Sequence, residues 1–517
     1  MKLLLVAGVL AQSACSILYN PNNLGEPPAP DAPIDVAVDA PPDMPTDTAI
    51  DAAPDSPTDA PPDAPQISLT SAMPNLLNEG AGNGGSRPAL VIITGTNFIS
   101  PTFTVSPIDD GGVMRNPAIV GSRIAANGTQ VVLALQVPVL TTIGQGNNTK
   151  AVRVTASQFG FDAMLDIPVK GLDELSPSGT VDTATLKPLY SRATFTSAVH
   201  FQGTAPALIR VASDITITAV VEVDGVNQAA GAHGCGGGGE AGGGGCGNGG
   251  GGGGNSGLGG SPGGGGSFGT AGQSGAGTNS PGGAGATTGE SLLLSLTTGA
   301  GAAGNRGNGG GGGGGATLGG GGAGGGGAGV IELTADGTIN VSGAGAVRAR
   351  GANGTAGGGV GGGNGGGGSG GAIVIRSGNG IASTGAWVSA PGGMGAGSGN
   401  TKGGDGGGGR VRIDTTTTVA GMVGTLVPTR GPAFAGTAPT FVAMANVDIG
   451  IVGGATQNYG VYVNGVAQAN ATTNASGAAT ASLTLAAGLS TVCTTVVPAI
   501  GTGMPEATRC IDVVYLP

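Results

Sequence analysis

Short apolar phrases return at intervals along the chain, and each phrase consists of three triplets in which apolar residues alternate with other residues. In the clearest phrase the apolar pairs are Ile331/Leu333, Ile339/Val341 and Val347/Ala349. Two further phrases keep the same frame: Ile209/Val211, Ile215/Ile217 and Val221/Val223, then Ile373/Ile375, Ile381/Ser383 and Val388/Ala390. Alternation places each pair on one face of a β-strand. Three short strands per repeat predict the stacked coils of a right-handed parallel β-helix over residues 177–430.

Residues 292–296 and 411–413 look like partial copies of the same phrase. In pattern, the region resembles the β-helices of bacterial surface proteins and of pectate-lyase-like proteins. No catalytic motif of those families accompanies the pattern.

Glycine separates the phrases, and most of the 114 glycines of the chain lie in this region. The runs should leave one corner of every coil. Glycine has much conformational entropy to lose, which favours floppy loops. Alternatively, adjacent runs lie side by side as extended helices whose backbones hydrogen-bond laterally. We expect partial order, with amide protons protected from exchange at Gly309–Gly315 and Gly357–Gly371.

Alternating β-rich segments flank the repeat region on both sides. Short strands separated by Gly, Pro and Asn predict β-sandwiches at residues 66–172 and 431–517, so the fold class is all-β and multidomain. The stretch Val91–Phe98, an apolar strand followed by Gly-Thr-Asn-Phe, resembles the IPT/TIG family of immunoglobulin-like domains. That resemblance implies a spacer or adhesive module. The second segment looks like a bacterial immunoglobulin-like domain.

The five cysteines favour a compartment in which disulfides form. Apart from Cys15 they make two pairs that are close in sequence, Cys235 with Cys246 and Cys493 with Cys510. A metal site of His233 with Cys235 and Cys246 would lack the fourth ligand of structural zinc. We therefore predict two disulfides, no metal and no cofactor.

The first residues form a short apolar segment that ends in Ala11-Gln-Ser-Ala-Cys15. It resembles a bacterial lipoprotein signal, in which residues 1–14 are removed and Cys15 carries the lipid. Gln12 departs from the usual Leu, so ordinary secretion remains the alternative. Ser16, by the same resemblance, favours the outer membrane. The expected location is the cell surface, with the lipid anchor as the contact to the membrane.

Residues 15–65 form the lipidated N-terminus and a stalk. Aspartate recurs at every fourth position from Asp31 to Asp63, mostly among Pro and Ala. Proline blocks helix and like charges repel, so the segment should be disordered and extended. A calcium-binding tract is the alternative, but the turn glycine that such sites need is absent.

Charge and candidate chemistry argue against catalysis and against nucleic acid. Only 9% of residues are charged, the net charge is -11, and no basic patch is present. Aligning the phrases makes Arg376 and Asp414 neighbours on adjacent coils, which favours an ion pair over an acid–base couple. Trp387, next to inward Val388, should point outward near the glycine corner, where it either packs over the neighbouring glycine run, which we favour, or stacks on a sugar ring. Trp387 and Arg376 are thus the candidate ligand contacts, and no residue is assigned a catalytic role.

We expect a monomeric structural or adhesive protein of the cell surface that contacts polysaccharide or a surface protein and is not an enzyme. Two alternatives remain. One is a carbohydrate-active β-helix lyase or hydrolase, which needs converging acidic and basic residues. The other is a periplasmic spacer without a ligand.

Overall fold

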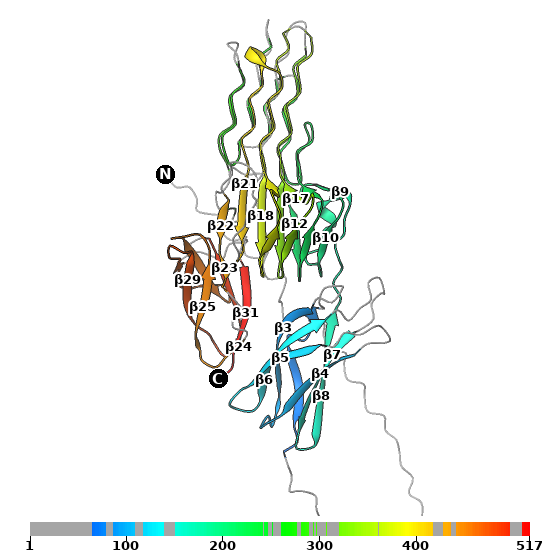
Figure 1. Cartoon of the computed structure of the whole chain (residues 1–517), viewed down its shortest axis with the longest axis vertical. Helices are drawn as coiled ribbons and strands as arrows, with labels where there is room; N and C mark the ends of the chain where they lie inside the picture. Colours follow the sequence, from blue (N-terminus) through cyan, green and yellow to red (C-terminus); the bar gives the residue numbers. More distant parts are fainter. Residues whose placement is uncertain are drawn as a thin grey trace, which may run out of the picture. The chain divides into compact units, whose positions relative to one another are not determined.

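The computed structural model describes residues 65–78, 86–108, 117–138, 150–240, 242–246, 251, 260–276, 281–288, 293, 296, 307, 320–359, 361–416, 428–435, 441–496 and 509–517. The predicted signal segment, the predicted lipidation site Cys15 and the predicted stalk up to residue 64 lie outside these residues, as does Gly309–Gly315. The described residues form an all-β multidomain chain (Figure 1).

Two four-stranded sheets build the first β-sandwich. One has the order β1 (Ser68–Met73), β3 (Ser86–Thr96), β6 (Gln130–Pro138), β5 (Ala118–Ile124), and the other β2 (Leu77–Asn78), β8 (Phe161–Lys170), β7 (Lys150–Gln158), β4 (Thr102–Ile108). Alternate residues of both sheets face a shared core that includes Val91, Leu133 and Val154. This is the layered packing expected of two sheets, antiparallel except for the parallel pair β2–β8, that bury one face each.

Three parallel sheets build the β-helix. Sheet 1 contains β10 (Ala193–Phe195), β13 (Ile215–Ile217), β16 (Ile339–Val341) and β19 (Ile381–Ser383). Sheet 2 contains β9 (Gly179–Asp182), β11 (Val199–Gln202), β14 (Val220–Glu222), β17 (Ala346–Arg348) and β20 (Val388–Ser389). Sheet 3 contains β12 (Ala207–Val211), β15 (Val330–Ala335), β18 (Ala372–Ser377), β21 (Arg410–Asp414) and β22 (Thr429–Gly431). A short 3-10 helix, η3 (Thr183–Thr185), follows β9.

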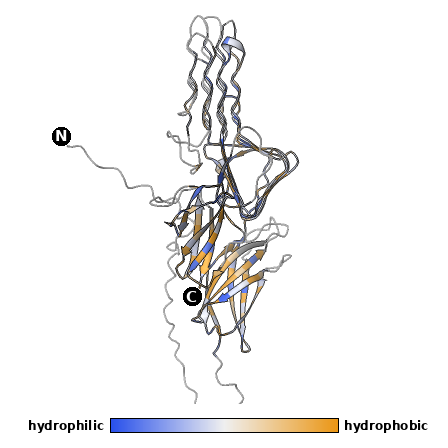
Figure 2. Cartoon of the chain, turned by 60° about the vertical axis from the view of Figure 1, so that its left-hand side comes forward, coloured by the Kyte–Doolittle hydropathy of each residue, from blue (hydrophilic) through white to orange (hydrophobic). Residues whose placement is uncertain are grey.

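The coils stack in the register that the phrases predict. Ile331 pairs with Ile373, Ile339 with Ile381, and Val347 with Val388. These six residues belong to one buried core. Figure 2 shows the superposed coils as a triangle, with the glycine runs leaving from one corner. The apolar pairs therefore do fill one interior, and the β-helix prediction is confirmed.

The repeat begins ahead of the first apolar phrase, inside the predicted range 177–430. Strands β10 and β11 form a coil ahead of β12, with Phe195 and Phe201 in the shared core. The partial copy at 411–413 is strand β21. Of the partial copy at 292–296 only Leu293 and Leu296 are among the described residues, and they belong to a separate small cluster on the outside of sheet 3.

The last domain is a second β-sandwich. One sheet has the order β23 (Ala433–Phe434), β25 (Asn446–Val452), β29 (Ala478–Thr484), and the other β24 (Phe441–Val442), β31 (Arg509–Tyr515), β30 (Gly488–Thr495), β26 (Asn458–Val463), β27 (Val466–Ala467), with β28 (Ala471–Thr472) beside β26. Cys493 and Cys510 lie opposite each other on β30 and β31 and form the predicted disulfide.

Candidate functional site

Three glycine-rich insertions leave the β-helix at the corner between sheet 2 and sheet 3. They follow β14, β17 and β20 and return into β15, β18 and β21. The connection from β11 to β12 is short, so the runs leave three coils and not every coil. Figure 1 shows the runs as long, side-by-side extended segments, with the 3-10 helix η4 (Gly399–Thr401) at their far end. We call this assembly the glycine array.

The array contains outgoing and incoming runs. The outgoing runs at 231–238, 351–358 and 391–396 follow sheet 2, and the incoming runs at 320–329, 362–371 and 402–409 lead into sheet 3. A further run at 260–267 lies against the incoming runs, since Gly263 N–H donates to the Asn364 carbonyl at 2.9 Å. The array therefore has at least three layers, formed by the outgoing runs, the incoming runs and the run 260–267.

The run 362–371 is hydrogen-bonded to its neighbours with a period of three residues. The N–H groups of Gly365 and Gly368 donate to the outgoing run 351–358, each at 2.9 Å. Those of Gly367 and Gly370 donate to the incoming run 402–409, also at 2.9 Å. Three residues per turn is the repeat of a polyproline-II helix, which has no internal hydrogen bonds and must find partners outside itself.

The same run also accepts hydrogen bonds from three other runs. Gly322, Gly325 and Ala328 donate to the carbonyls of residues 363, 366 and 369, at 2.8, 2.8 and 3.0 Å. Gly393 and Ala396 donate to Gly368 and Gly365, and Gly263 and Gly266 donate to Asn364 and Gly367. Five neighbouring runs thus surround the central run. The prediction of lateral hydrogen bonding is confirmed for this part of the chain.

Glycine is required in the array because the backbones approach too closely for side chains. A Cβ at Gly365 or Gly368 would overlap a carbonyl oxygen of the run 320–329, one at Gly366 a carbonyl oxygen of the run 260–267, and one at Gly367 a carbonyl oxygen of the run 391–396. All residues from 363 to 371 are buried. The buried interior of the array is therefore made almost entirely of backbone.

Residues with side chains stand where the outgoing runs face solvent. Arg350, Asn353, Thr355 and Ala356 are exposed on one run, and Pro391 and Met394 on the next. The two rows are tied together, because Met394 N–H donates to Asn353 Oδ1 at 2.8 Å and Gly354 N–H to the Met394 carbonyl at 2.9 Å. This face is regular, rigid and lined by few side chains.

The base of the array is fastened by an ion pair and a disulfide. Arg350 donates to Asp224 through Nε at 2.7 Å and through its backbone N–H at 2.6 Å, which joins the starts of two outgoing runs. Cys235 and Cys246 form the predicted disulfide, and Gly327 N–H donates to the Cys235 carbonyl. Among the described residues no group of His, Cys, Asp and Glu could hold a metal ion.

A ladder of charges, buried except for Arg210, crosses the outer face of sheet 3. Glu332 Oε1 lies 3.2 Å from Arg210 Nε and 3.4 Å from Arg376 Nη1, and Arg376 Nε lies 3.2 Å from Asp414 Oδ2. Arg412 completes it, 2.7 Å from the same carboxylate. The predicted pairing of Arg376 with Asp414 is confirmed. The segment around Phe268 covers the adjacent apolar part of this face.

The surroundings of Glu332 keep it charged. Burial alone would raise its pKa, but the charges of Arg376 and Arg210 and the hydrogen bond from Thr334 together lower it below the usual value of 4.5. Arg376 is only 3% exposed, so it stabilises the coil stack and is not accessible to a ligand. Its assignment as a ligand contact is corrected accordingly.

Trp387 points inward, contrary to the prediction from alternation. It is 1% exposed and belongs to the β-helix core together with Val388. Trp387 precedes the first residue of β20, so it lies in the bend between sheets 1 and 2, where strand alternation does not apply. Its role is packing, and the structure gives it no access to a ligand.

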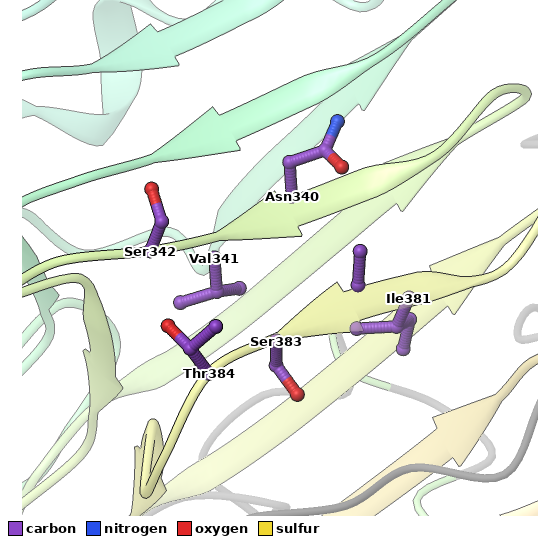
Figure 3. Close-up of a pocket in the computed structure, with 7 residues that line it drawn as sticks. Asn340, Val341, Ser342, Ile381, Ser383 and Thr384 are labelled. Atoms are coloured by element: carbon purple, nitrogen blue, oxygen red, sulfur yellow. The ribbon is translucent and has the colours of Figure 1, made fainter.

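A hollow of about 400 Å³ lies over strands β16 and β19, lined by residues 340–342 and 381–384. Figure 3 shows the Asn340 amide and the hydroxyls of Ser342, Ser383 and Thr384 around it. Its lining carries neither an acid nor a base, so it offers no acid–base chemistry. It could hold a small polar ligand only by neutral hydrogen bonds.

Comparison with protein-family models and with curated proteins gives no match to this chain. Within the described part of the chain, no helix has the length and apolar character to cross a membrane. The geometry above therefore carries the functional argument.

Proposed function

We propose that this chain is a lipid-anchored protein of the outer membrane that displays the glycine array at the cell surface, in a structural or adhesive role. Cys15 is the lipidation site, the aspartate-rich segment is the stalk, and the two sandwiches flank the β-helix along the chain. The protein acts as a monomer.

The central run 362–371 is the observation that supports a structural or adhesive role. Ordering glycine costs more conformational entropy than ordering any other residue. The array offsets that cost by backbone hydrogen bonds and gains stiffness, yet its interior carries few groups that could do chemistry. A long stiff element that ends in loops suits display and contact better than it suits catalysis.

The face made by Arg350, Asn353, Pro391 and Met394 is the proposed contact surface. These side chains are exposed on rigid, parallel runs, so a partner can bind without ordering them further. Their mixture of a cation, an amide and apolar groups suits a polysaccharide or the surface of another protein.

Protease treatment of intact cells tests the location. If the proposal is right, protease added outside removes the folded domains from whole cells, and a Cys15→Ser variant appears in the medium or periplasm. A periplasmic spacer would survive until the outer membrane is opened, which would contradict surface display.

A glycan array probed with the whole protein tests the adhesive role. We expect binding that falls when Asn353 and Met394 are both replaced by Ala, while replacing Asn340 in the hollow of Figure 3 leaves it unchanged. Cleavage of a bound polysaccharide would instead support a β-helix lyase or hydrolase. Binding that is insensitive to Asn353 and Met394 would rule out this face.

A further inference from the structure

One end of the first sandwich carries a cluster of exposed apolar side chains. Ile99 is 62% exposed, Phe159 58% and Phe161 39%. They come from two loops, 97–101 and 157–161, and we call them the apolar tip. Neither loop contains Asp, Glu, Lys or Arg.

Phe159 occupies a backbone position that disfavours it. It has φ 52° and Gly160 has φ 82°, and the flanking residues Gln158 and Phe161 pair across the β7–β8 hairpin. Positive φ at both central residues defines a type I′ turn, whose first position favours Asn, Asp or Gly. A bulky residue there is strained, and such strain persists where the side chain has a use.

Gln158 holds the two loops of the apolar tip together. Its side chain is 5% exposed, and Oε1 accepts hydrogen bonds from the backbone N–H of Ile99 at 3.0 Å and of Ser100 at 2.8 Å. Its Nε2 donates to the Asn97 carbonyl at 2.8 Å. The tip is therefore preformed, and its apolar side chains are exposed from a fixed platform.

The chain enters the sandwich at this same end. Asn97 Nδ2 donates to the Gln66 carbonyl at 2.7 Å, and Ser68 pairs with Thr96 at the start of β1. Strand β8 runs from Phe161 at the tip to Lys170 at the opposite end, from which the chain continues to the β-helix. The segment that leads back to Cys15 thus joins the sandwich beside the apolar tip.

We propose that the apolar tip inserts into the lipid bilayer to which the chain is anchored. This inference rests on the proposed anchor at Cys15. The 52 positions from Cys15 to Ile67 span about 160 Å when extended, so the bilayer lies within reach. Two loops without charged side chains suit a fluid apolar partner, whereas Phe and Ile offer a sugar no hydrogen-bonding group.

The test uses the full chain carrying Cys15→Ser, so that no lipid is attached, and sedimentation with phosphatidylcholine vesicles. In this background Phe159→Asn should bind vesicles roughly tenfold more weakly, because one buried aromatic ring is lost. The same substitution should raise the melting temperature of the domain by roughly 4 °C, because Asn suits the turn. Met164→Asn, which removes a side chain 57% exposed on the strand away from the tip, is the matched control and should bind normally.

Two results would overturn the proposal. One is that Phe159→Asn and its parent bind vesicles equally well, or that neither of them binds. The other is an equal loss in Met164→Asn, which would mean nonspecific adsorption. The anchor is tested separately with the double variant Cys15→Ser, Phe159→Asn expressed in cells. If this double variant still stays with the membrane, the proposed anchor at Cys15 is wrong.

Discussion

The β-helix and the glycine array are two parts of one stack that are held together by different means. In the β-helix the coils enclose aliphatic side chains such as Ile331 and Ile373, which are fully buried. In the array the run 362–371 is also buried, but carbonyl and N–H groups of five neighbouring runs surround it. Burial of apolar area stabilises the first part, and satisfied backbone hydrogen bonds at close approach stabilise the second.

The two parts share one register. Strand β15 pairs Val330 with Ala372 of β18, and the preceding runs continue this alignment, because Ala328 N–H donates to Ser369 and Gly325 N–H to Gly366. Polyglycine has no side chains to specify which run lies beside which. The strands of sheet 3 therefore set the alignment, and the glycine runs extend it.

Replacing Glu332 by Gln should have the largest effect on the stability of the β-helix. It leaves buried Arg376 without one of its two carboxylates, which should lower the free energy of unfolding by about 3 kcal/mol. Because the folded state lowers the pKa of Glu332, its stabilisation is present above pH 4.5 and is lost as the pH falls below that value.

Urea unfolding at pH 7 and pH 3.5 measures this prediction for Glu332. The difference between Glu332→Gln and the parent should shrink at the lower pH. Asp166→Asn is the control, since its pair with Arg153 is exposed and should matter little. A difference that does not change with pH would mean that charge is not what Glu332 contributes.

Replacing Ile375 by Ala tests whether the array depends on the coils. The lost side chain is fully buried and should cost about 2–4 kcal/mol. Because the strands align the glycine runs, amide protection in the array should fall together with that of β18. Protection that persists in the array while β18 opens would show that the glycine runs hold their own register.

Replacing Gly367 by Ala tests the array alone. A methyl group there would overlap the Gly393 carbonyl, so we expect a local loss of about 1–3 kcal/mol. The β-helix core, which the substitution does not touch, should keep its unfolding midpoint. Gly358→Ala is the matched control, because no atom lies within 4 Å of the added carbon. Equal effects of the two substitutions would contradict close backbone packing.

Local pattern was sufficient to predict the parts of the fold that depend on alternation. The pairs led by Ile331 and Ile373 lie in one interior, and both disulfides form between cysteines close in sequence. The early coil lies within the predicted range 177–430, but no phrase marked it, because Phe195 and Phe201 take the place of the aliphatic pairs and no glycine run follows β11.

The candidate ligand contacts were wrong for reasons that lie outside local pattern. Trp387 stands in a bend, where residues on both sides of a strand boundary face inward. Arg376 lies on the outward face of its strand, yet it is buried in the charge ladder of sheet 3, next to the cover around Phe268. No residue near Arg376 in the sequence signals that cover, since it comes from a separate insertion.

The smallest and most specific expectation concerns which amides of the outgoing run 351–358 exchange slowly. The N–H groups of Ala352 and Thr355 donate to the incoming run 320–329, and those of Gly351 and Gly354 donate to the run 391–396. Within the described residues, the N–H groups of Asn353 and Ala356 have no partner. Amide hydrogen exchange, measured at single residues by mass spectrometry with fragmentation, should be slow at two successive residues and fast at the third, and this pattern should repeat along the run. Uniformly fast exchange would indicate floppy loops, and a two-residue alternation would indicate strands. Only a three-residue repeat fits a polyproline-II helix, in which every third amide of a surface run faces water.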